Sequence, residues 1–107
     1  MIKPRRIRES RGSPFTKEEA KALLSETLRE WSLNEAGTEI SRIYKFENYY
    51  ETMAFVNAVA WITLREGHHP DLEVGFHRCT VRYTTHVLNG LSENDFICAT
   101  KVDALFN

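Results

Sequence analysis

The stretch from Asn48 to Val74, NYYETMAFVNAVAWITLREGHHPDLEV, contains the change of periodicity that decides the fold. Its apolar side chains first recur every three or four residues, which predicts a helix. The stripe consists of Met53, Val56, Ala60 and Leu64, broadened by Phe55, Val59 and Ile62. A helix this apolar is expected to be buried on more than one side, against its own sheet and against a partner subunit. We expect it to end near Gly67, because glycine commonly follows a helix and because His69 precedes a proline.

Alternating patterns on both sides of this helix predict strands. Apolar residues alternate with polar ones at Leu72, Val74 and Phe76, and again at Cys79, Val81 and Tyr83. Two strands with a short connection near His77 fit this pattern. Before the helix, residues 39–46 also alternate, although imperfectly, and Ala36-Gly37 suggests the turn of a first hairpin.

Two further helices are predicted at the ends of the chain. Thr16 and Glu19 match a capping box, and the apolar spacing that follows predicts a helix over residues 17–30. Ser92 and Asp95 mark the start of a last helix. The order helix, hairpin, helix, hairpin, helix predicts a single α+β domain. Its four-stranded antiparallel sheet would carry three helices on one face (α-β-β-α-β-β-α).

Composition supports one domain and narrows the class of protein. The chain has 107 residues, 42% of them apolar, and a formal net charge of −1. This balance argues against nucleic acid or an acidic membrane as the main partner. Residues 1–14 carry a net charge of +4 and are predicted to be a basic disordered tail, which leaves residues 15–107 as the domain. Cys79 and Cys98 have no motif spacing, so we expect free, reduced thiols in a cytoplasmic protein.

Three of the four histidines could form a site. His68 and His69 follow the predicted helix end, and His86 ends the last predicted strand, so the three imidazoles could converge. A simple turn is one reading. A three-histidine metal site is another, but adjacent histidines normally point apart. General acid–base catalysis suits imidazole near neutral pH and tolerates divergent side chains. His77 is expected to be a surface residue.

The sequence as a whole resembles a known family. GHHPDLEV and TTHVLNGLSENDF, with WSL and ISRIYKFENYYETMAFVNAVA upstream, are similar to pterin-4a-carbinolamine dehydratase, also called 4a-hydroxytetrahydrobiopterin dehydratase, over about residues 16–106. The resemblance implies the fold described above, a homodimer or homotetramer, and no metal or organic cofactor. It also implies a pterin substrate: the 4a-hydroxytetrahydropterin released by aromatic amino acid hydroxylases, which is dehydrated to quinonoid dihydropterin.

The resemblance assigns roles to six residues. His68 and His86 match the family's proton-transfer histidines, and His69 matches the histidine that mainly binds the pterin. Flanking them are Pro70 and Thr85, whose backbone groups are expected to hydrogen-bond the pterin ring.

Asp95 matches the family's aspartate in the final helix, where it would hold a histidine or the substrate. Two positions depart from the family pattern: Leu64 and Val87 stand where many members carry a carboxylate, and Glu66 could replace the first only if the helix end unwound. A non-catalytic dimerisation or assembly module of the same fold is therefore the alternative function.

Overall fold

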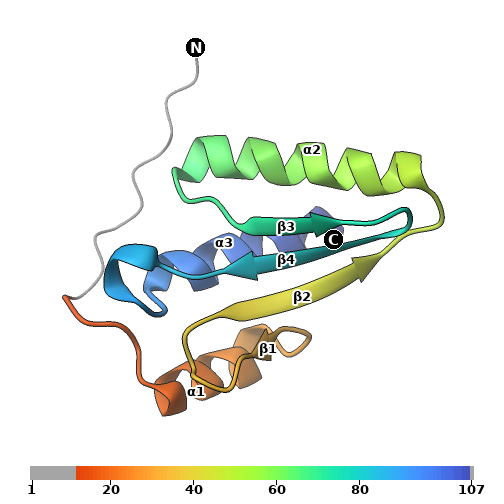
Figure 1. Ribbon diagram of the computed structural model, residues 1–107. Helices are drawn as coiled ribbons and strands as arrows, with labels where there is room; N and C mark the ends of the chain where they lie inside the picture. The colour runs from red at the N-terminus through yellow and green to blue at the C-terminus, as the bar shows by residue number, and fades with distance from the viewer. Residues whose placement is uncertain (1–11, 107) are drawn as a thin grey trace.

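The computed structural model describes residues 12–106. In chain order the elements are α1 (Lys17–Thr27), β1 (Ser32–Leu33), β2 (Ile40–Lys45), α2 (Tyr49–Glu66), β3 (Asp71–Val74), β4 (Arg78–Tyr83) and α3 (Glu93–Asp103), with 3-10 turns η1 (His86–Leu88) and η2 (Ala104–Phe106) (Figure 1). This order confirms the predicted fold class. Most of the predicted basic tail, residues 1–11, lies outside the described residues.

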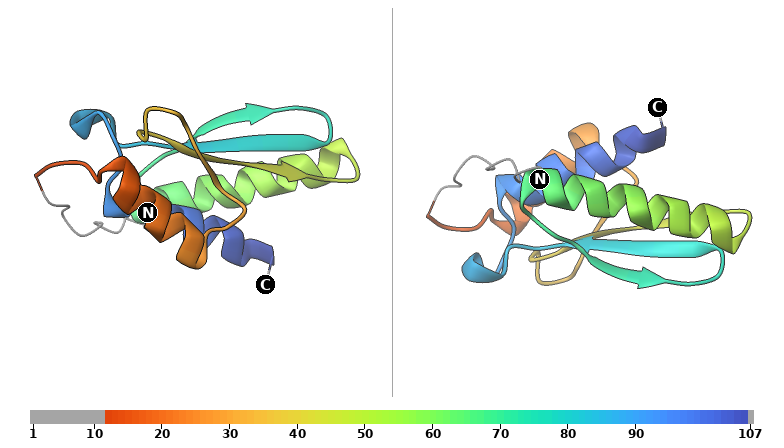
Figure 2. Two further views of the ribbon diagram at one scale, coloured as in Figure 1. Left: turned by 90° about the horizontal axis from the view of Figure 1, so that it is seen from below. Right: turned by 90° about the horizontal axis from the view of Figure 1, so that it is seen from above.

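The four strands form one antiparallel sheet in the order β1-β2-β4-β3. The helices cover one face of this sheet, and the other face carries none (Figure 2). Strand β4 lies between β2 and β3, so Val81 pairs with Arg42 on one side and with Leu72 on the other. Inward-facing residues of β4, among them Cys79, Val81 and Tyr83, are fully buried under the helices. The alternation read from the sequence therefore places β4 at the centre of the core.

Helix α2 ends where the sequence predicted, at Gly67. Asn48 caps its start by accepting a hydrogen bond from Glu51 N–H at 2.9 Å. At its end Gly67 adopts the left-handed conformation, with φ +69°, and its N–H bonds to Thr63 O at 2.9 Å. This glycine turns the chain sharply out of the helix, because a side chain would strain that backbone. His68 therefore leaves the helix end in a fixed direction.

The predicted apolar face of α2 is only partly the buried one: Phe55 and Val59 are buried, as predicted, and Val56 and Ile62 pack partly buried against the core. The buried side chains are Thr52, Phe55, Val59 and Glu66. Ala60 and Leu64 are exposed instead. Apolar residues occur nearly all round this helix, so periodicity alone could not fix which face meets the sheet. Within residues 12–106, no helix combines the length and the apolar character needed to cross a membrane.

Helix α1 is shorter than predicted, since it ends at Thr27. Its capping box is present: Glu19 N–H donates to Thr16 Oγ1, and Thr16 N–H donates to Glu19 Oε1. Leu28 then leaves helical geometry, at φ −131° and ψ 54°. This turn carries both Leu28 and Trp31 into the core, where each is at most 4% exposed.

The end of α3 is tied to the start of the sheet through Asp103. Its carboxylate accepts from the Trp31 indole at 3.0 Å, from Arg42 at 3.0 Å, and from the Tyr44 hydroxyl. The Arg42 guanidinium also lies 4.6 Å from the centre of the Tyr44 ring, a cation–π contact. This cluster fixes the C-terminal half of α3, far along the helix from its first turn.

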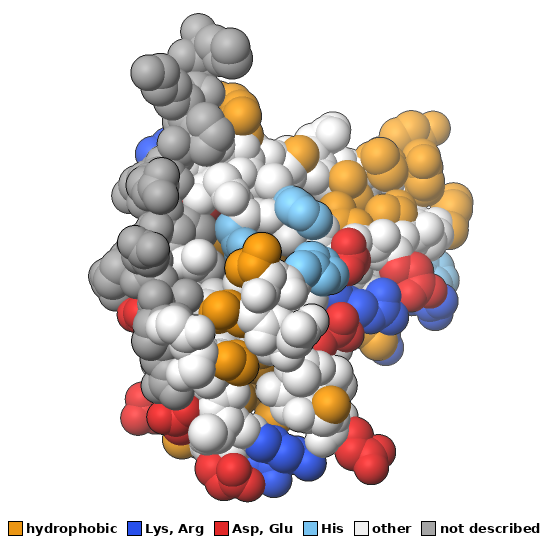
Figure 3. All heavy atoms as spheres, turned by 60° about the vertical axis from the view of Figure 1, so that its left-hand side comes forward, with side chains coloured by type: hydrophobic (Ala, Val, Ile, Leu, Met, Phe, Trp, Pro, Cys, Tyr) orange, Lys and Arg blue, Asp and Glu red, His pale blue; other side chains and the backbone are white. Residues whose placement is uncertain are grey.

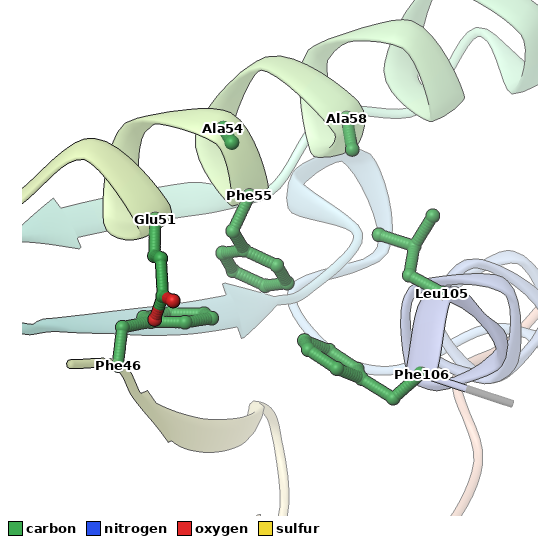
Figure 4. Close-up of a pocket in the computed structure, with 7 residues that line it drawn as sticks. All are labelled: Phe46, Glu51, Ala54, Phe55, Ala58, Leu105 and Phe106. Atoms are coloured by element: carbon green, nitrogen blue, oxygen red, sulfur yellow. The ribbon is translucent and has the colours of Figure 1, made fainter. Parts of the chain in front are cut away.

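Beside that cluster, an apolar hollow lies between α2 and η2, with Phe55 and Phe106 lining it (Figure 4). Leu105 and Phe106 are 42% and 56% exposed at this hollow. Cys79 and Cys98 are both buried free thiols, as predicted.

Candidate functional site

The site begins with His68, the first residue after the left-handed Gly67. Its Nε2 lies 2.6 Å from Oδ1 of Asp95, and its side chain is 16% exposed. The imidazole lies nearly parallel to the ring of Tyr83 from β4, with centroids 5.7 Å apart and an interplanar angle of 13°. Both the carboxylate and the aromatic face therefore define how His68 is oriented.

Asp95 is itself held on both oxygens. It is fully buried in the first turn of α3. Its second oxygen, Oδ2, accepts from Ser92 N–H at 2.9 Å and from the Thr85 hydroxyl at 2.8 Å. A negative charge is favourable at a helix N-terminus, where unpaired N–H groups and the helix dipole point toward it. The structure therefore places an oriented carboxylate behind His68, as a histidine-holding role for Asp95 requires.

This contact determines which nitrogen of His68 is available. A carboxylate can only accept, so the neutral imidazole carries its proton on Nε2. The other nitrogen, Nδ1, has no hydrogen-bond partner among the described residues. Its lone pair can accept a proton, and the resulting imidazolium can donate one. Chemically, His68 is thus equipped as a general acid and base acting through Nδ1.

His69 and His86 are more open than His68. Both are exposed. The Nδ1 atom of His69 lies 3.3 Å from the carbonyl oxygen of Pro70. Histidine side chains, in pale blue, gather on one face of the molecule (Figure 3). His77 is exposed in the turn between β3 and β4, as the sequence predicted.

The loop that carries His86 is closed by paired backbone groups. Thr85 N–H donates to Gly90 O at 2.8 Å, and Thr85 O accepts from Leu88 N–H at 3.0 Å. Asn89 takes the left-handed conformation, with φ +52°, at the turn of this loop. Because both backbone groups of Thr85 are engaged within the loop, the group it offers to the site is its hydroxyl.

No three His, Cys, Asp or Glu side chains within residues 12–106 are placed to hold a metal ion together. His68 contacts the carboxylate of Asp95 and the ring of Tyr83. The structure thus assembles His68, Asp95 and Thr85 directly, with His69 and Pro70 next in the chain and His86 on the adjoining loop.

The sequence did not predict where two residues near His68 would lie. Tyr83 was read only as a core position of a strand. Glu66 was considered as a replacement for the carboxylate missing at Leu64, but α2 stays helical through Glu66 and this side chain is buried against Lys101 of α3. The signal for Glu66 was its spacing of seven residues from Val59, which places it on the true buried stripe.

Comparison with known proteins identifies the family. The family model for pterin 4 alpha carbinolamine dehydratase matches residues 13–105. The chain belongs to this family. A relative from Nitrosomonas eutropha, provisionally named pterin-4-alpha-carbinolamine dehydratase, is 59% identical over 92 residues, covering 86% of this chain and 80% of its own. One from Legionella pneumophila with the same provisional name is 52% identical over 97 residues, covering 91% of this chain and 86% of its own.

Solved structures agree with the fold of this pterin dehydratase family member. A transcriptional coactivator/pterin dehydratase from Brucella melitensis superposes with a TM-score of 0.80 at 26% identity, covering 87% of this chain and 98% of its own. A pterin dehydratase-like protein identified as a RuBisCO assembly factor in the alpha-carboxysome superposes with a TM-score of 0.63 at 23% identity, covering 75% and 93%. The second likeness concerns the fold alone.

Proposed function

We propose that this protein dehydrates 4a-hydroxytetrahydropterin to quinonoid dihydropterin by histidine general acid–base catalysis. The observation that carries the proposal is the His68–Asp95 pair, which leaves Nδ1 of His68 open in a chain of the pterin dehydratase family. Removing water from the carbinolamine requires that the hydroxyl leave C4a and that N5 lose its proton, so a C4a=N5 double bond forms. Hydroxide is a poor leaving group, and an acid must protonate it as the C–O bond breaks.

The histidines divide this work. His68 and His86 exchange the two protons, one giving a proton to the departing hydroxyl and the other taking the proton from N5. His69 binds the pterin together with the neighbouring Pro70. Thr85 and Asp95 hold His68 in its tautomer and orientation. No step requires a metal or an organic cofactor.

An assembly role is the second candidate. It is favoured by apolar side chains that α2 leaves open: Tyr50 is 84% exposed and Trp61 is 49% exposed. Surfaces of this kind commonly mark protein–protein contacts. The same surface also suits the homodimer or homotetramer that we propose for the enzyme in the cytoplasm, so exposure alone does not separate the two functions.

A turnover assay distinguishes the dehydratase from the assembly module. Chemically generated 4a-hydroxytetrahydropterin is mixed with the purified protein, and its dehydration is followed by ultraviolet absorbance against buffer. We expect acceleration by the wild-type protein and by a His77→Ala control, because His77 is exposed in the turn between β3 and β4. A wild-type rate equal to buffer would overturn the enzyme. Stoichiometric zinc in the purified protein would instead contradict the metal-free mechanism and favour a three-histidine metal site.

A further inference from the structure

Glu66 is a charged residue in an unfavourable place. It is the last residue of α2 and only 4% exposed. A carboxylate at a helix C-terminus opposes the helix dipole. Burying it also removes its hydration, which costs free energy even when the charge is paired. Net stabilisation alone is therefore a poor explanation of why a carboxylate occupies this position.

The partner of Glu66 lies on the helix that carries Asp95. Lys101 Nζ is 3.6 Å from Glu66 Oε2, and the lysine side chain is 38% exposed. Glu66 is two residues before His68, and Lys101 is six residues after Asp95 on α3. The ion pair and the His68–Asp95 hydrogen bond thus both tie the end of α2 to α3. Glu66 immediately precedes the chain reversal at Gly67, and His68 immediately follows it.

Two buried groups, Tyr83 and Cys98, lie next to His68. Tyr83 lies against the ring of His68, and Cys98 Sγ lies 4.0 Å from the His68 carbonyl oxygen. Burial, with the charge of Glu66 adding to it, raises the pKa of the Cys98 thiol to about 12. Burial also raises the pKa of Tyr83, with smaller contributions from the neighbouring Cys98, Asp95 and Glu66. Both groups stay protonated near neutral pH, so they add no charge of their own beside Asp95, Glu66 and Lys101.

We propose that the Glu66–Lys101 ion pair is a positioning device for the proposed reaction: it fixes the end of α2 against α3 so that His68 meets Asp95. The inference rests on the proposed function for its kinetic consequence but not for its structural one. Glu66 and Lys101 act through His68 and contact no substrate.

The test compares Lys101→Met, which removes the pair, with Lys101→Arg, which keeps it. The lysine side chain is partly exposed, so both variants are expected to fold. Lys101→Met should lower kcat roughly 10-fold with little change in KM, because a small displacement of a catalytic group is costly. It should also shift or broaden the NMR signal of the His68 Nε2 proton. Lys101→Arg should retain both properties.

Asp103→Asn is the matched control for general destabilisation. It weakens contacts to Trp31, Arg42 and Tyr44 at the other end of α3. We expect a lower melting temperature with kcat and the His68 signal unchanged. Glu66→Gln should reproduce Lys101→Met.

The proposal is overturned if Lys101→Met leaves the His68 signal and kcat as in the wild type, or if Asp103→Asn alters them equally. If the wild type itself shows no turnover, the proposed function fails while the His68 signal still tests the positioning role.

Discussion

The Nε2 atom of His68 lies 2.6 Å from the Oδ1 atom of Asp95, although the two residues are 27 positions apart in the sequence. One residue follows the C-terminal end of α2, and the other lies in the first turn of α3. Because the carboxylate fixes the proton on Nε2, this contact selects the tautomer of a histidine whose second nitrogen stays open.

Replacing Asp95 by Asn reverses that tautomer. The amide keeps an oxygen for Ser92 N–H and Thr85 but can present its NH₂ group to His68, so Nε2 must accept and Nδ1 must carry the proton. Wrong-tautomer variants in other histidine-dependent enzymes lose activity by about 10⁴-fold. Here we expect kcat to fall at least about 100-fold with the fold retained, as checked by turnover and circular dichroism. Glu73→Gln, the same chemical change at an exposed strand residue, should leave kcat unchanged; equal losses would contradict the role of Asp95.

The three histidines should separate in their kinetics. His68→Ala and His86→Ala are each expected to lower kcat by about 100-fold or more, because each removes a proton-transfer group. His69→Ala should mainly raise KM, because it removes a contact that substrate and transition state share. Steady-state kinetics at several pterin concentrations measures both parameters. A large kcat loss in His69→Ala with unchanged KM would instead assign proton transfer to His69 and pterin binding to His68 or His86.

Tyr83 should act through its ring. Its hydroxyl is buried with no hydrogen-bond partner among residues 12–106, so Tyr83→Phe should leave the free energy of unfolding unchanged or raise it by up to about 1 kcal/mol. The ring that faces His68 remains, and kcat should be retained. Tyr83→Leu removes that ring and leaves space in the core, so it should cost about 2–4 kcal/mol and lower kcat. Denaturant titration and turnover measure the two effects. Loss of kcat in Tyr83→Phe would assign the role to the hydroxyl.

Stability should decline at alkaline pH. Burial raises the pKa of Cys98 from 9.0 to about 12, so the thiol ionises first in the unfolded chain. The unfolded state then binds fewer protons than the folded state, and stability falls as pH rises. The contribution is fully present below pH 9 and is lost between pH 9 and about 12. Denaturant titrations from pH 7 to 11 should show this decline, and Cys98→Ala should make it shallower; an equally steep decline in that variant would remove Cys98 as a cause.

Local signals in the sequence predicted most of the fold. Gly67 and the Thr16–Glu19 capping box each act within a few residues, so the end of α2 and the start of α1 could be placed without tertiary information. The three histidines were singled out by their places at predicted element ends, whereas their roles and that of Asp95 were assigned through the family resemblance. The buried face of α2 could be predicted only in part, since it depends on which of many apolar side chains the twisted sheet accepts.

The partners of the site were hidden for the same reason. Tyr83 alternates like any inward strand residue, and nothing in the pattern shows that its ring will lie against His68. Glu66 was considered only as a substitute for a missing carboxylate, and its pairing with Lys101 of α3 could not be seen from the sequence. The surroundings of Tyr83 and Glu66 depend on contacts between elements that are distant in the sequence. Periodicity describes only one element at a time.

The His68–Asp95 contact also makes the site a reporter of folding. Neither helix can bring the two side chains together alone, and the contact forms only after α2 and α3 have both docked on the sheet. Compact states with formed helices and loose packing would retain their helical circular dichroism but lack this hydrogen bond. During refolding, activity should therefore return with the last packing step, later than the helical signal.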